Sequence, residues 1–197
     1  KGRIIMRSVN FRIVVDRKMK KFILNLLTVL AWIYQIICVI GIIMWIVMGG
    51  VILFGIKNPD FRAGFESSMY VKGVSVDSYV GVLIVMLLLM ILMSIAAFLI
   101  CRYARLIVKN IKQEVYFADS NLNLLKKLLI SVAGYTIISI IDFIMLMTHR
   151  AWFIKYANNV LYPSGVTTGL LFLAVLYVVY LVFKYGMKVQ EDADSII

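Results

Sequence analysis

Proline, cysteine and histidine are scarce in this chain. Its 197 residues include two Pro, two Cys and one His. Zinc and iron–sulfur sites need several thiols or imidazoles at short spacing, so the sequence predicts no metal site and no cofactor. Cys38 and Cys101 are expected at different depths of two separate apolar runs, where a disulfide between them does not fit. His149 is expected at a membrane boundary, as a solvated residue rather than a ligand.

Acidic residues are also few, with 10 Asp and Glu against 21 Lys and Arg, for a formal net charge of +11. In a soluble protein this excess would suggest nucleic acid as a partner. The chain has no base-stacking motif or zinc-ligand cluster, and membrane proteins concentrate Lys and Arg beside anionic lipid. We therefore expect contact with anionic lipid and no direct binding of nucleic acid.

Apolar sequence is in large excess, at 63% of residues against about 45–50% in soluble domains. It is gathered into four runs, each with one charged residue at most, at about 22–56, 79–101, 128–148 and 166–183. A membrane-spanning helix needs about 20 apolar residues, and the first run is too long for a cleaved signal peptide. The sequence predicts an all-α integral membrane protein, with four transmembrane helices in one domain over residues 1–197.

Lys and Arg are distributed unevenly between the connections. Sixteen lie before the first run, in the 102–127 connection and in the 184–197 tail, whereas five lie in the 57–78 and 149–165 connections. The positive-inside rule then places both termini in the cytoplasm, which suits a multi-pass protein of a bacterial cytoplasmic membrane. We expect spans two and four to continue as cytoplasmic helices. Because the chain begins with Lys1, Met6 is a candidate natural start.

Local signals refine this topology. Pro59, Gly64 and Gly73 argue against one continuous helix in the first outer loop, and Ala151–Leu161 is a candidate surface helix in the second. Asp119 or Ser120 is expected to cap the third span. Small residues allow helices to approach closely, and the candidates for such contacts are Ser94, Ala96, Ala97 and Gly134.

A basic stripe follows the second span: Arg102, Arg105, Lys109 and Lys112. Spacings of three, four and three place all four residues on one face of a helix. Two interpretations stand side by side. The stripe docks an acidic protein partner, or it lies on anionic lipid, where each cation contributes about 1 kcal/mol.

The tail changes from basic to acidic at Glu191, Asp192 and Asp194. Since the tail and the basic stripe are both expected in the cytoplasm, one hypothesis is that the tail folds back onto the stripe. The alternative is a solvated tail whose charges contribute little.

Asp142 is the one ionisable residue inside a span. An aspartate at mid-span costs about 2.5–3.5 kcal/mol, and such residues mark ion paths, proton sites or helix contacts. Asp142 could reach water near the outer end, bond Ser139 locally, or pair with another polar residue in a span. Those candidates are Asn25, Gln35, Tyr135 and Thr136.

Two segments resemble a bacterial family of small four-helix membrane proteins, the domain of unknown function 2975 family. One is Ile107–Lys112, followed by Val115–Phe117, Asn121 and Leu124–Lys127. The other is Phe183–Gly186, followed by Gln190, Glu191 and Asp194. The resemblance implies four spans and a partnership with small helix-turn-helix regulators.

The sequence shows no nucleophile elbow, metal-ligand pair or phosphate-cradling loop, so we expect a non-enzymatic protein. The leading hypothesis is a membrane-bound regulator that binds a cytoplasmic transcription regulator. A second hypothesis is an immunity or resistance protein against a membrane-active peptide or toxin, using the outer aromatics Phe61, Phe65, Tyr70 and Trp152. A third is a small channel or transporter that works as a homo-oligomer, with Asp142 in its pathway.

Overall fold

Every regular element in the part of the chain that the structure describes is an α-helix. The computed structural model describes residues 2–68, 73–115, 118–153 and 164–194, with backbone only at 2–17, 68, 151, 153, 164–165, 190–191 and 193–194. Its helices are α1 (Gly2–Gly55), α2 (Pro59–Ser68), α3 (Val76–Lys112), α4 (Asp119–Thr148), α5 (Arg150–Phe153) and α6 (Ser164–Asp194). Helices α1, α3, α4 and α6 are long and apolar enough to cross a membrane. The predicted all-helical chain with four such helices is confirmed.

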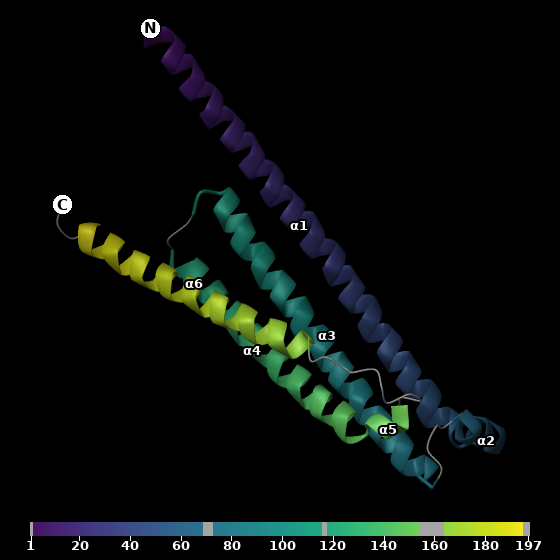
Figure 1. Cartoon of the computed structure of the whole chain (residues 1–197). Helices are drawn as coiled ribbons and strands as arrows, with labels where there is room; N and C mark the ends of the chain where they lie inside the picture. The colour runs from purple at the N-terminus through teal and green to yellow at the C-terminus, as the bar shows by residue number, and fades with distance from the viewer. Residues whose placement is uncertain (1, 69–72, 116–117, 154–163, 195–197) are drawn as a thin grey trace.

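The four long helices lie side by side in chain order. Helix α1 packs on α3, α3 on α4, and α4 on α6. The N-terminal end of α1, the C-terminal end of α6 and the α3–α4 turn lie at one end of this layer, and α2 and α5 lie at the other (Figure 1). We call these the terminal end and the α2 end.

The edges of the layer are apolar and uncovered. Phe22, Leu30, Met44 and Phe54 are exposed along α1, and Leu171, Val178 and Val182 are exposed along α6. A helix that is apolar on all sides belongs in a protein core or in lipid. Because these side chains face outward in the single chain, lipid is the solvent that fits them.

Two clusters of buried side chains hold the helices together. Toward the α2 end, Ile52 of α1 packs with Val76, Val80 and Leu87 of α3. Toward the terminal end, α3, α4 and α6 meet around Leu125, Leu128, Val132 and Leu176. Helix α4 lies between α3 and α6, so its inner face is the most completely covered, and Val132 is only 2% exposed.

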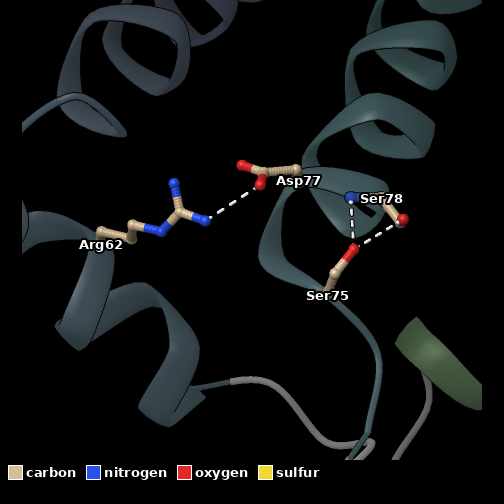
Figure 2. Close-up of polar contacts among 4 residues, drawn as sticks. All are labelled: Arg62, Ser75, Asp77 and Ser78. Atoms are coloured by element: carbon tan, nitrogen blue, oxygen red, sulfur yellow. Dashed lines mark hydrogen bonds and ion pairs between the residues drawn. The ribbon is translucent and has the colours of Figure 1, made fainter.

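The first connection contains a short helix that is tied to α3. Figure 2 shows the guanidinium of Arg62 on α2, 3.0 Å from the carboxylate of Asp77. Ser75 caps α3, because its hydroxyl accepts the Ser78 N–H at 3.2 Å and donates to the Ser78 hydroxyl at 2.7 Å (Figure 2). Gly73 has φ +93, a conformation that favours glycine. The expectation that no single helix fills residues 57–78 is confirmed.

The predicted cap of α4 is wrong. Ala118 occupies the N-cap position and makes no side-chain cap hydrogen bond, while Asp119 is already in the first helical turn. A residue with helical backbone no longer occupies the position from which a capping side chain reaches the free N–H groups. Asp119 instead places a negative charge near the positive end of the helix dipole.

The predicted close-packing glycine is also wrong. A Cβ added at Gly134 would meet nothing within 4 Å. The close approach is at Gly169 of α6, where a Cβ would lie 2.9 Å from Oγ1 of Thr136 on α4. Among the other small residues that were singled out, Ala96 is buried. The α4–α6 contact therefore depends on a glycine that the sequence pattern did not distinguish.

Candidate functional site

The α3–α4 turn is a closed helix-ending motif. The Glu114 N–H donates to the Ile111 carbonyl at 3.1 Å, and the Val115 N–H donates to the Asn110 carbonyl at 3.1 Å. Together these are the two bonds of a Schellman motif. Glu114 has φ +62 at the position where glycine is usual, so the turn is fixed despite a backbone cost.

Side-chain hydrogen bonds of two asparagines stabilise the same turn. Asn121 is 1% exposed. Its Nδ2 donates to the Val115 carbonyl at 2.7 Å, and its Oδ1 accepts Nδ2 of Asn110 at 2.6 Å. Losing a partner of a buried polar group costs about 1–3 kcal/mol, so this pair holds the turn in one geometry. Residues 116–117 lie outside the described part of the chain.

The basic stripe is divided between two environments. The Arg105 guanidinium lies 3.9 Å from the centroid of the Trp32 ring on α1. Nζ of Lys112 donates to the Thr28 hydroxyl of α1 at 2.8 Å. Arg102 and Lys109 are exposed. All four residues lie on α3, and the sequence does not indicate that α1 contacts two of them.

Two grooves open between α1 and α3 at the terminal end. One, of about 300 Å³, is lined by Thr28, Trp32, Arg105, Leu106, Lys109 and Lys112. The other, also of about 300 Å³, is lined by Lys20, Lys21, Leu24, Asn25, Ile111, Lys112 and Glu114. Lys112 belongs to both, and we call the first one the Trp32 groove.

The acidic tail stays helical as far as it is described. Helix α6 is unbroken to Asp194, so these residues do not turn back on themselves. Asp192 is exposed, and the side chains of Glu191 and Asp194 lie outside the described residues. A contact between this tail and the basic stripe stays a prediction.

Asp142 lies beside a second buried oxygen. Oδ1 of Asp142 and Oγ of Ser139, one turn away on α4, are buried with no hydrogen-bond partner among the described residues. The local Ser139–Asp142 bond considered from the sequence is therefore absent. Two other candidate partners are engaged elsewhere, since Gln35 donates to the Phe98 carbonyl at 3.4 Å and Thr136 to the Val132 carbonyl at 2.9 Å.

A chain of aromatic rings crosses the α2 end. Phe61 stacks on Phe65, Phe65 meets the ring of Tyr79 edge-on, and Tyr79 stacks on Trp152, with centroids 6.2, 5.6 and 6.2 Å apart. His149 meets Trp152 edge-on at 4.6 Å. The rings thus join α2, α3 and α5, together with the residue that caps α4. Of the outer aromatics named from the sequence, Tyr70 lies outside the described residues, as does most of the candidate surface helix, of which α5 is the described part.

Comparison with known proteins gives no match. No family model, curated protein or solved structure matches this chain. Its function is therefore argued from the terminal end, where the turn, the exposed cations and the two grooves lie together.

Proposed function

We propose that this chain is a non-enzymatic protein of the bacterial cytoplasmic membrane that holds a cytoplasmic protein partner, a transcription regulator, at the inner surface. The observation that carries the proposal is the fastened α3–α4 turn. Asn110, Asn121 and the Schellman bonds fix this turn, whereas a simple connection between two spans needs no such fixing.

A fixed turn suits binding because less conformational freedom is lost when a partner docks. Exposed cations surround it, and they would draw an acidic surface and set its orientation. Three of these exposed cations lie on α3 or α4 outside the Trp32 groove: Arg102, Lys126 and Lys127.

The placement of this surface in the cytoplasm rests on the charge distribution and on the fold. The excess of Lys and Arg in the end segments and in the 102–127 connection supports an inward orientation. The fold supports a common side for these segments, because the N-terminal end of α1, the C-terminal end of α6 and the α3–α4 turn share one end of the layer (Figure 1). The resemblance to the four-helix family supports a regulator as the partner.

The test is copurification from cells that express a tagged chain at its natural level. We expect one soluble regulator to copurify, with its yield reduced severalfold when Arg102, Lys126 and Lys127 are changed to Gln. Lys57→Gln, at the α2 end, is the matched control and should retain the partner. Equal recovery with the triple variant and the wild-type chain, or recovery of membrane proteins alone, would contradict the proposal.

A further inference from the structure

The Trp32 groove combines three cations with an apolar wall. Arg105, Lys109 and Lys112 come from α3, and Thr28 and Trp32 come from α1. The described residues that line it include no carboxylate. An anion entering this space would therefore meet three positive charges and no opposing charge from the lining.

Two of the three cations are held in position before any ligand binds. The Arg105 guanidinium lies over the Trp32 ring, and because this contact is to the ring and not to an acceptor oxygen, its N–H groups stay available for a phosphate. The ammonium of Lys112 uses one donor on Thr28 and keeps two others. Lys109 is exposed, so its side chain can turn toward a ligand in the groove. The groove is thus organised to receive an oxyanion.

The apolar wall indicates what carries that anion. Thr28 and Trp32 belong to the stretch of α1 that is long and apolar enough to cross a membrane. Beside them, Leu27, Val29 and Leu30 are exposed. Cations that face an exposed apolar helix suit a molecule with a charged head and a hydrocarbon tail, and basic pockets between spans bind lipid headgroups.

We propose that the Trp32 groove binds the phosphate of an anionic phospholipid, with an acyl chain along the exposed face of α1 at Leu27–Leu30. A volume of about 300 Å³ accommodates a phosphate and its glycerol. A free phosphate would use the cations and leave the apolar wall uncovered. An acidic peptide would bring further charges against that wall, where burying them is costly. This site is separate from the protein-binding surface proposed above.

The test uses Trp32 as the reporter of an occupied groove. The full chain with Trp45→Phe and Trp152→Phe keeps Trp32 as its one indole. It is reconstituted into phosphatidylcholine vesicles containing phosphatidylglycerol, and either lipid carries bromine on its acyl chains as a quencher. We expect brominated phosphatidylglycerol to quench Trp32 more strongly than brominated phosphatidylcholine at the same mole fraction.

Charge variants identify the contacts. Lys109→Gln should lower the preference for phosphatidylglycerol about fivefold, as expected for a contact of about 1 kcal/mol. Lys109 is exposed, so this variant should fold, and its thermal unfolding in detergent checks that. The matched control is Lys184→Gln with Lys188→Gln on α6, which removes charge at the same end but not from the groove, and it should leave the preference unchanged.

Other results would overturn the assignment. Equal quenching by both lipids would show that the groove does not select an anionic headgroup. A similar loss of preference in the Lys184 and Lys188 control would show general attraction to a negative surface instead of a site. If millimolar inorganic phosphate or an acidic peptide changes the Trp32 emission in vesicles where brominated phosphatidylglycerol gives no preferential quenching, the groove binds that free anion or peptide and not a lipid.

Discussion

At the scale of single residues, the backbone conformation of Glu114 destabilises the folded chain. Its φ of +62 lies in the left-handed region, which costs an L-residue about 1–2 kcal/mol. Glycine adopts this conformation without that cost, although it loses more entropy on folding. We therefore expect Glu114→Gly to stabilise the chain by about 1 kcal/mol, measured as a higher midpoint of thermal unfolding in mild detergent.

The carboxylate of Glu114 needs a separate control because it lines the groove that contains Lys20, Lys21 and Lys112. Glu114→Gln removes the charge and keeps the strained backbone. It should therefore unfold at a lower temperature than the glycine variant. If Gln and Gly give the same midpoint, the gain comes from removing charge, and the argument from backbone strain is wrong.

At the scale of helices, the α4–α6 contact depends on the absence of one methyl group. A Cβ at position 169 would lie 2.9 Å from Oγ1 and 3.4 Å from Cγ2 of Thr136. Thr136 is 2% exposed and its hydroxyl donates to the Val132 carbonyl, so it has little room to move. Gly169→Ala should therefore separate the helices and destabilise the chain by about 1–3 kcal/mol.

The matched control for this prediction is Gly134→Ala on α4. An added Cβ there meets nothing within 4 Å, and alanine favours a helix over glycine. It should unfold at the wild-type concentration of SDS or above it, while Gly169→Ala unfolds at a lower concentration. Destabilisation of both variants to the same extent would show that loss of glycine, and not the Thr136 contact, is responsible.

Hydropathy predicted these helices well but not how they meet. A charge-free run of sufficient length predicts a span whatever helices pack against it. The run at 79–101 accordingly lies inside α3, as expected. Hydropathy does not predict how α3 pairs with α1. If one of two uniformly apolar helices slides along the other by one turn, the hydropathy of both sequences is unchanged. The contacts of Arg105 with Trp32 and of Lys112 with Thr28 depend on that register. The Asn110–Asn121 bond likewise depends on how α3 and α4 close.

At the scale of the whole molecule, the arrangement of the four long helices determines which connections lie on the same side of the membrane. The N-terminal end of α1, the C-terminal end of α6 and the α3–α4 turn share the terminal end, so they must lie on one side of a bilayer if all four helices cross it (Figure 1). From the excess of Lys and Arg there we expect that side to be the cytoplasm. Both native thiols are free, and replacing Cys38 and Cys101 with Ala allows single reporter cysteines to be introduced.

We expect Glu66→Cys on α2 to react with a membrane-impermeant maleimide in intact spheroplasts. Gln113→Cys at the α3–α4 turn and Lys188→Cys on α6 should react only after the membrane is opened. All three positions are exposed in the structure, so differences in labelling report sidedness and not burial. Labelling of Lys188→Cys from outside, with Gln113→Cys protected, would mean that α6 does not cross the bilayer. The acidic end of α6 would then face away from the basic stripe, and a tail folded onto that stripe would be impossible.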